Sequence, residues 1–273
     1  MAIRSVFQTN RKQKSMSDKS HPSQWKYKSP EESGWHEVIT PENSACKLTW
    51  VYRLNLPKGT SHQVHKPDQE LNGVVIAGKV ALAHDNNVYE LDRLDSLFLP
   101  GNEKAQLEAH EDSVLYFGGS FNEGKGHFFT RKYDLTLPHG DIHQIHGEPP
   151  YKREVFMTLA QQDEGSRLIC GITVGEEGKW TSWPPHQHTN DLEEVYCFFD
   201  IPKPQTAFHY SSRKAGEFEH IHAVSTGDCV VIPEGYHPTC GMPGVKSSYF
   251  WIMAAHRPES RRYDLAVNDP HFG

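Results

Sequence analysis

The residues best suited to chemistry lie in two short segments of the second half of the chain. His186 and His188 stand two positions apart, and residues two apart in a β-strand point to the same face of a sheet. Two imidazoles on one face can bind a single ion. His237 follows at the end of a Pro-x-Gly turn, which directs it toward the same point. Three imidazoles with one carboxylate form a typical ligand set for a divalent transition metal.

The carboxylate of this ligand set has two candidates. Glu193 and Glu194 both follow His188 at a distance that a short turn and the start of the next strand can span. Because adjacent residues of a strand point to opposite faces, only one of them can bind the ion. Spacing alone leaves both open.

The first half of the chain does not repeat this pattern. Its histidines at the corresponding place, His62 and His65, stand three positions apart, and no histidine follows directly after the turn at Pro100-Gly101. We expect His62 and His65 at the surface or at an interface between subunits. One divalent metal per chain follows, bound in the second half.

Short β-type runs separated by turn residues must position these side chains. No long helix is indicated by an apolar period of 3.6 residues, and runs at this spacing predict a β-sandwich or barrel. The sequence LDRLDSLFLPG at 91–101 is echoed by VSTGDCVVIPEG at 224–235. We therefore predict an all-β chain with a duplicated barrel.

The chain divides into four segments by this pattern. Residues 1–34 are polar and are predicted to form an extended N-terminal arm, which a partner subunit can order. Residues 35–120 are predicted to form a barrel without metal, and residues 153–273 a metal-binding barrel. Residues 121–152 between them have little strand pattern and are predicted to be a connector.

Composition limits the class of protein. A chain of 273 residues can bury a substantial core, and its net charge of −7 argues against a nucleic-acid partner. No run approaches the roughly 20 apolar residues of a membrane span, and the N-terminus lacks the apolar segment of a secretory signal, so we expect a soluble, cytoplasmic protein. The scattered cysteines are predicted to be reduced thiols, with Cys170, Cys197 and Cys229 packed in the core.

A family resemblance rests on the two segments that carry the histidines. PPHQHTNDLEEVYCFF at 184–199 and VIPEGYHP at 231–238 resemble the two cupin motifs. Beyond these motifs they resemble a bicupin family that contains 5-deoxy-glucuronate isomerase of inositol breakdown and 5-keto-4-deoxyuronate isomerase of pectin breakdown. The similarity extends over residues 40–273 and is clearest from about 153 onward. It implies two cupin barrels, each a double-stranded β-helix or jelly roll, in one chain.

The resemblance also implies a function. It places the metal ligand immediately before Val-Tyr, which is Glu194, and implies zinc or manganese, a small sugar-acid substrate and a homo-oligomer. LEEVY and GYHP look more like 5-deoxy-glucuronate isomerase, whereas EVYCFF and YFWIMAA look more like the 5-keto-4-deoxyuronate enzyme. The first activity is the preferred prediction. The alternatives are the second isomerase, an Fe(II)-dependent cupin dioxygenase and a sugar-binding protein without enzymatic activity.

The residue that moves the proton in such an isomerase has three candidates. They are Glu193, Tyr249 on the strand after the third histidine, and Arg153 at the start of the second barrel. A sugar acid also needs a cationic group to bind its carboxylate. Arg261 and Arg262 are the candidates near the C-terminus.

Overall fold

β-Strands form nearly all of the regular structure. The structure is a computed structural model, and it describes residues 19–272. Its helices in that range are short 3-10 turns, η1 (Pro22–Gln24), η2 (Pro258–Ser260) and η3 (Tyr263–Leu265). The named strands that pair with one another do so in antiparallel fashion. The all-β class predicted from the sequence is confirmed.

Two sheets are built from the first half of the chain. One is a six-stranded sheet in the order β11 (Phe129–Arg131), β8 (Ser96–Leu99), β5 (Gln69–Ala77), β10 (Ser113–Phe121), β3 (Trp50–Leu56) and β2 (Gly34–Ile39). The other is a four-stranded sheet in the order β4 (Ser61–Val64), β9 (Ala105–Ala109), β6 (Val80–His84) and β7 (Asn87–Leu91).

The second half builds three further sheets. The largest has seven strands in the order β1 (Lys26–Lys28), β20 (Asp228–Ile232), β17 (Leu192–Phe198), β22 (Ser248–Ala255), β14 (Leu168–Gly175), β13 (Arg153–Leu159) and β12 (His143–His146). A four-stranded sheet follows the order β15 (Trp180–Thr181), β21 (Thr239–Gly241), β18 (Ala207–Ser211) and β19 (His220–Val224). A two-stranded sheet joins β16 (His186–Gln187) to β23 (Val267–Asn268).

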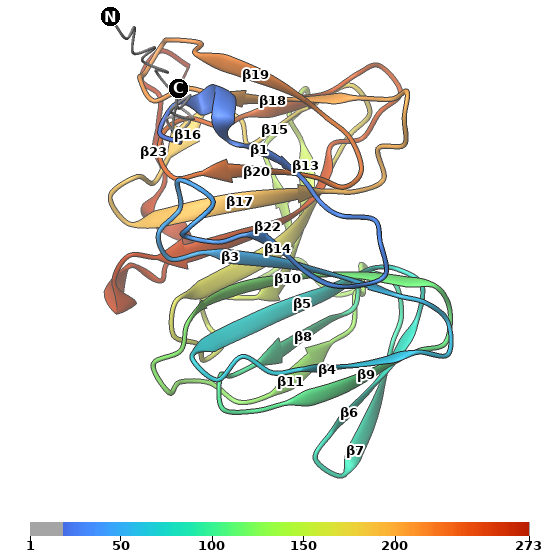
Figure 1. Cartoon of the computed structure of the whole chain (residues 1–273). Helices are drawn as coiled ribbons and strands as arrows, with labels where there is room; N and C mark the ends of the chain where they lie inside the picture. Colours follow the sequence, from blue (N-terminus) through green and yellow to red (C-terminus); the bar gives the residue numbers. More distant parts are fainter. Residues whose placement is uncertain (1–18, 273) are drawn as a thin grey trace, which may run out of the picture.

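The sheets are arranged in layers, with the two largest in the middle (Figure 1). The six-stranded and seven-stranded sheets face each other, and each has a four-stranded sheet on its far side. Side chains from both large sheets form one continuous apolar core, among them Val51, Val74, Phe98, Ile172 and Phe250. This common core fixes the two halves of the chain against each other.

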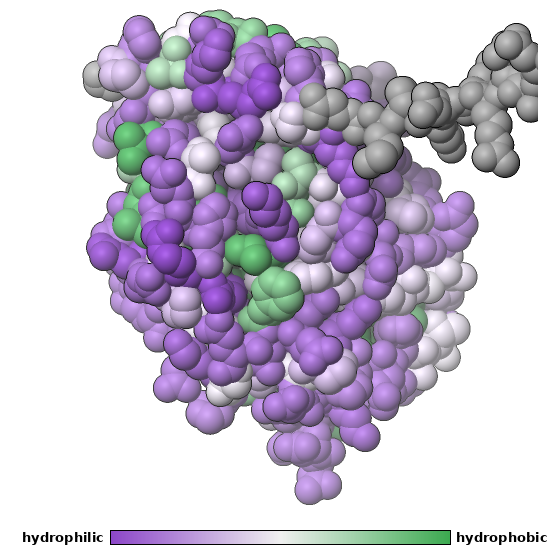
Figure 2. Space-filling model, turned by 60° about the vertical axis from the view of Figure 1, so that its left-hand side comes forward, coloured by the Kyte–Doolittle hydropathy of each residue, from purple (hydrophilic) through white to green (hydrophobic). Residues whose placement is uncertain are grey.

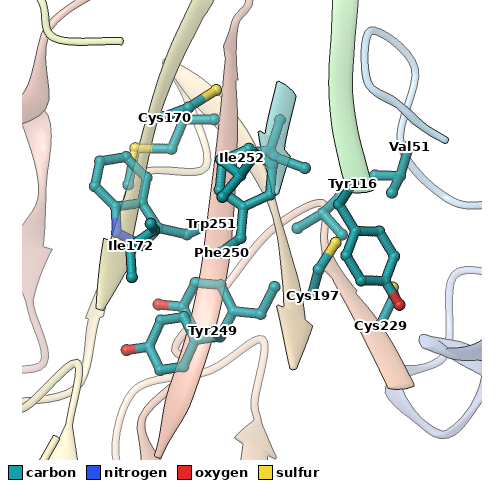
Figure 3. Close-up of a cluster of buried hydrophobic side chains, with 14 of the residues drawn as sticks. Val51, Tyr116, Cys170, Ile172, Cys197, Cys229, Tyr249, Phe250, Trp251 and Ile252 are labelled. Carbon is teal, nitrogen blue, oxygen red and sulfur yellow. The ribbon is translucent and has the colours of Figure 1, made fainter. Parts of the chain in front are cut away.

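Strand alternation in β17 and β22 gives each residue of these strands a defined side. Tyr116 of β10 lies beside Cys197 and Cys229, on the side of the six-stranded sheet (Figure 3). Tyr196, the neighbour of Cys197, points the other way and contacts His209 of β18. Residues of β17 and β22 that pair with Tyr196, or lie two positions from it, therefore face the space between the seven-stranded sheet and its four-stranded partner.

The cysteines agree with the predicted reduced state. All five are free thiols, and four of them are buried. Cys170, Cys197 and Cys229 pack within the core, as predicted (Figure 3).

The N-terminal segment has a different role from the extended arm predicted there. β1 pairs with β20 at the edge of the seven-stranded sheet, and Trp25 is buried in the core. The chain then crosses over, and β2 pairs with β3 in the six-stranded sheet. This segment thus spans both halves of its own chain. Residues 1–18 of the predicted arm lie outside the described residues.

The predicted connector, 121–152, also contains regular structure. β11 pairs with β8 of the first half, and β12 pairs with β13 of the second. Its sequence has few of the alternating apolar residues that mark a strand, because these strands lie at sheet edges and are only partly buried.

The outer surface is mostly polar. The face drawn in Figure 2 is largely hydrophilic, with apolar residues in small separate groups. Among the described residues, no helix is long and apolar enough to cross a membrane.

Candidate metal centre

The predicted metal ligands lie at neighbouring strand ends of the second half. His186 belongs to β16, and His188 follows that strand directly. Glu194 lies near the start of β17 and pairs with Ile232, the last residue of β20. The ends of β16, β17 and β20 therefore meet at one place.

A glycine turn brings the third histidine to this place. Gly235 has a φ of +85°, in the left-handed region that favours glycine. A Cβ atom at this position would stand 2.2 Å from the carbonyl oxygen of Ser212. The turn can therefore form only with glycine, and it directs His237 back over the end of β20.

Backbone carbonyls orient all three imidazoles. Each Nδ1 lies 3.0 Å from a carbonyl oxygen, and the pairs are His186 with Pro184, His188 with Leu192, and His237 with Gly235. A carbonyl oxygen only accepts hydrogen bonds, so each Nδ1 donates its proton and each Nε2 keeps a lone pair. Hydrogen bonds of this kind orient histidines that bind metals.

The donor atoms of His188, Glu194 and His237 converge. They lie within 4.8 Å of one another, and all three side chains are buried. Nε2 of His188 stands 3.0 Å from Oε2 of Glu194, and Nε2 of His237 stands 3.1 Å from the same oxygen. The ring of His186 lies beside them, 4.8 Å from the ring of His237, but its donor atom is outside this converging group.

These residues fit a bound cation. Nε2 of His237 is buried and has no hydrogen-bond partner, although it faces the carboxylate of Glu194. Burial raises the pKa of Glu194, but its interactions with the imidazoles of His188 and His237 outweigh burial and hold its pKa at about 2. The carboxylate is therefore ionised and lies against the Nε2 atoms of two imidazoles. A divalent ion satisfies such a donor set.

Glu193 lies on the opposite face of β17. Its carboxylate accepts hydrogen bonds from the backbone N–H groups of Lys47 and Leu48, at 2.8 and 2.6 Å, and from the hydroxyl of Thr49 at 2.8 Å. These donors belong to the first half of the chain. The structure therefore brings Glu194, and not Glu193, to the metal donors, and it places Glu193 away from any substrate bound there.

Tyr249 lies on the same side of the sheet as Glu194. Its ring stacks on Tyr196 at 4.1 Å, and its hydroxyl lies 3.1 Å from Oγ of Ser182. Ser182 is also 2.6 Å from the hydroxyl of Tyr196, whose ring lies 5.8 Å from that of His237. A chain of three hydroxyls thus borders the metal donors. Sequence reasoning missed Tyr196, although it stands two residues after Glu194 and so shares its face.

The predicted arginines have different surroundings. The guanidinium of Arg261 donates to the carbonyl oxygens of residues 160, 161, 163 and 168, so it holds the backbone. Arg262 pairs with Asp264 at 2.7 Å on the surface. Arg153 donates to the carbonyl oxygen of Trp183 at 3.1 Å. Neither Arg261 nor Arg262 is placed to bind a sugar acid.

The first half has an apolar interior where the second half has its metal donors. Leu71 and Leu99 pair across β5 and β8 and are buried among other leucine and valine side chains. His62 is half-buried and stacks on Trp35 at 5.3 Å, and His65 is exposed. Over residues 19–272, the converging group in the second half is the one set of potential ligands found.

Comparison with known proteins identifies the family. The model of the KduI/IolB family matches residues 25–273. The chain belongs to the KduI/IolB family.

Relatives of this KduI/IolB member include 5-deoxy-glucuronate isomerases. The enzyme of Geobacillus kaustophilus (strain HTA426) is 26% identical over 244 residues, which cover 83% of this chain and 86% of that protein. The enzyme of Bacillus subtilis (strain 168) is 25% identical over 253 residues, which cover 86% and 90%. These names agree with the enzyme class predicted from the sequence.

Solved structures confirm the fold. An IolB-like protein from Salmonella typhimurium LT2 has a TM-score of 0.80 at 20% identity and covers 91% of this chain and 98% of its own. Bacillus subtilis oxalate decarboxylase, described with Mn(II) centres, has a TM-score of 0.55 at 12% identity and covers 89% and 79%. This KduI/IolB chain shares their cupin fold. The predicted division into two barrels at stated boundaries stays a prediction.

Proposed function

We propose that this protein is a metal-dependent 5-deoxy-glucuronate isomerase that acts in inositol breakdown. The observation that carries the proposal is the converging group of His188, Glu194 and His237 in a chain of the KduI/IolB family. The names of the relatives supply the substrate. His186 completes the proposed ligand set, because its ring adjoins that of His237 and its Nδ1 is already bound by a carbonyl.

The proposed ion is zinc or manganese, one per chain. When bound, a divalent ion supplies Lewis acidity that polarises a sugar carbonyl and its neighbouring hydroxyl. Imidazole and carboxylate ligands suit either metal. The interconversion of aldose and ketose needs no change in the oxidation state of the ion.

The hydroxyl chain beside the donors suits the proton transfer of this reaction. An aldose–ketose isomerase removes a proton from one carbon and returns it to the next. Burial raises the pKa of Tyr249, so its phenol stays protonated at neutral pH and can donate a hydrogen bond or a proton. Ser182 links it to Tyr196, which provides a path along which a proton can move. We therefore favour Tyr249 over Glu193 among the predicted catalytic residues, as the group that donates a proton to an oxygen of the sugar rather than as the base that removes the proton from carbon.

The test combines metal analysis with substrate turnover. Purified protein is analysed for metals and then incubated without oxygen with 5-deoxy-glucuronate and, separately, with 5-keto-4-deoxyuronate. About one zinc or manganese per chain, with an aldose–ketose shift by NMR on the first sugar, is the expected result. Turnover of the second sugar alone would replace the substrate. Bound iron with activity only after oxygen is admitted would overturn the isomerase in favour of a dioxygenase.

A further inference from the structure

The register of the seven-stranded sheet places Arg153 on the same face as the metal donors. Paired residues of neighbouring strands share a face. Glu194 pairs with Met253, and Tyr249 lies four residues from Met253 on β22. Tyr249 pairs with Thr173, and Arg153 pairs with Gly175, two residues further along β14. Cross-strand pairing and a move of two or four residues along a strand both leave the side chain on the same face of the sheet. Arg153 and Glu194 therefore point to the same side of the sheet.

A second path through the backbone connects Arg153 to the donors. Nη1 of Arg153 donates to the carbonyl oxygen of Trp183 at 3.1 Å. The next carbonyl along the chain, that of Pro184, accepts from Nδ1 of His186 at 3.0 Å. The guanidinium and the imidazole are thus bound to adjacent peptide units, whose Cα atoms are no more than about 3.8 Å apart. Arg153 therefore lies near His186 of the proposed ligand set.

The charge of Arg153 is not neutralised by a described carboxylate. Its hydrogen bonds go to the carbonyl oxygens of Trp183 and Tyr151. Other arginines of the second half, Arg213 and Arg257, are each bound to a glutamate or aspartate. Arg153 also borders a cavity of about 460 Å³ at the ends of β13 and β14, whose lining includes Lys152 as well as Glu154 and Glu176. A half-buried guanidinium without a carboxylate partner can bind an anionic ligand.

Two polar side chains accompany Arg153. His146 of β12 pairs directly with it, and so shares its face. Tyr263 of η3 packs edge-on against His146 at 5.9 Å and over Trp251 at 5.5 Å. Burial raises the pKa of Tyr263, the charge of Arg153 lowers it and that of Glu194 raises it further. The phenol therefore responds to both the guanidinium and the metal donors, as expected of a group between them.

We propose that Arg153, with Tyr263 and His146, forms the subsite that binds the carboxylate of the sugar acid. This inference rests on the proposed function, in which the carbonyl end of the sugar meets the metal. The carboxylate and the carbonyl of a uronate stand at opposite ends of one carbon chain. Arg153 lies on the donor face and is bound to the peptide unit next to the one that holds His186, so the far end of such a chain can reach it. The subsite thereby selects sugar acids over neutral sugars.

The first experiment measures binding without turnover. Calorimetry of the zinc-loaded protein compares glucuronate with glucose, which lacks the carboxylate. We expect the wild-type protein to prefer glucuronate and Arg153→Gln to lose about 10- to 100-fold in affinity for glucuronate alone, the usual effect of removing a charge-assisted hydrogen bond. Arg262→Gln, a surface arginine beside Tyr263, is the matched control and should bind as the wild type does.

A second variant and a kinetic comparison guard against a simple loss of folding. Tyr263→Phe removes a hydroxyl for which the described residues provide no hydrogen bond, so the fold should persist while affinity for glucuronate falls several-fold. With 5-deoxy-glucuronate, Arg153→Gln should raise KM far more than it lowers kcat and should keep its zinc. Equal preference for glucuronate in wild type and in folded Arg153→Gln would overturn the subsite. Absence of turnover by the wild type would count against the proposed function, while the binding comparison would still decide on Arg153.

Discussion

At the scale of single residues, the candidate metal centre depends on where each imidazole proton is held. The carbonyl that accepts from Nδ1 of each histidine leaves its Nε2 free to bind a cation. Nε2 of His237 is buried without a hydrogen bond, so this position is costly unless a cation occupies the site. The same hydrogen bonds that orient the rings thus leave nitrogen atoms suited to bind a cation.

Removal of a ligand should abolish metal binding and leave the fold intact. His237→Ala removes one nitrogen donor and relieves a buried unpaired group. We expect a loss of metal affinity greater than the roughly 10- to 100-fold seen when an outer-shell partner is removed, and a loss of activity with it. Metal content after dialysis and the far-ultraviolet circular dichroism spectrum check both points. His65→Ala, at an exposed histidine of the first half, is the control. Full metal occupancy in His237→Ala would contradict the assignment.

Sequence reasoning predicted which side chains would lie together, and the structure groups His188, Glu194 and His237, but their detailed arrangement was not predicted. His-x-His, Pro-x-Gly-x-His and the adjacent glutamates carry a spacing that strand geometry makes informative. The choice between Glu193 and Glu194 depended on which face of β17 meets the first half of the chain, and a single sequence does not contain that information. Ser182 was not predicted because it stands 14 positions before Tyr196 in the sequence, and only the fold brings the two hydroxyls together.

At the scale of elements, β5 and β17 carry equivalent buried glutamates. Glu70 of β5 accepts hydrogen bonds from the backbone N–H groups of Ser166, Arg167 and Leu168, each at 2.6 Å. Glu193 of β17 accepts from residues 47–49 in the same manner. Each half of the chain thus holds the segment that leads into a strand of the other half, and the two contacts are reciprocal.

The reciprocal contacts should make Glu70 and Glu193 important for stability rather than for chemistry. Glu193→Gln replaces one acceptor oxygen by an NH2 group that faces backbone donors, and we expect a loss of about 2–3 kcal/mol in the free energy of unfolding. Glu70→Gln should behave alike. Denaturant unfolding measures both, and zinc content should remain about one per chain. A Glu193→Gln protein of normal stability with greatly reduced kcat would instead support a catalytic role.

The hairpin of β18 and β19 should be sensitive to acid. Its loop is closed by Glu219 and Arg213, 2.7 Å apart, and the hydrogen bond from Arg213 lowers the pKa of Glu219 from 4.5 to about 2. A carboxyl whose pKa is lower in the folded state than in the unfolded state stabilises the fold at pH values above its unfolded-state pKa. This contribution is lost as the pH falls through the folded-state pKa. We expect Glu219→Gln to lower the free energy of unfolding by about 1 kcal/mol at neutral pH, a small loss because the ion pair is partly exposed. The loss should become smaller as the pH falls below about 4.5.

The control for this hairpin is in the same loop. Glu217→Gln alters an exposed glutamate that stands 3.6 Å from Lys214, so it should leave both stability and its pH dependence nearly unchanged. Urea unfolding of the three proteins between pH 7 and about pH 3 makes the comparison. A difference between wild type and Glu219→Gln that stayed constant over this range would contradict the proposed role of the ion pair.

At the scale of the whole molecule, the sequence predicted the β-strands better than the path of the chain between the sheets. Alternating apolar runs predicted the strands because alternation follows from burial on one side of a sheet. The N-terminal segment was expected to be an arm because β1 is short and polar, with Lys26 and Lys28 beside Asp228 at 3.6 and 3.8 Å. Trp25 and Ser29 of this segment are nonetheless buried. The predicted homo-oligomer stays a prediction.

The contact between the two large sheets leads to the last prediction. A Cβ atom on Gly118 of β10 would stand 2.6 Å from Cγ2 and 2.7 Å from Cγ1 of Ile252 on β22. Gly118→Ala therefore overpacks the interface between the halves, and we expect a loss of about 1–3 kcal/mol in the free energy of unfolding. Ile252→Ala leaves a cavity and should cost about 2–5 kcal/mol.

A double variant tests whether the two substitutions act on one contact between the halves or destabilise each half independently. In Gly118→Ala with Ile252→Ala the new methyl group occupies part of the new cavity, so the combined loss should be smaller than the sum of the single losses by about 1 kcal/mol or more. Gly140→Ala, at a glycine with no heavy atom within 4 Å of its Cβ position, is the control and should have little effect. If denaturant unfolding gave strictly additive losses, the two sheets would not be in contact at these residues. Coupling with a single unfolding transition would mean that the apolar first half supports the metal centre by holding the sheet on which Glu194 lies.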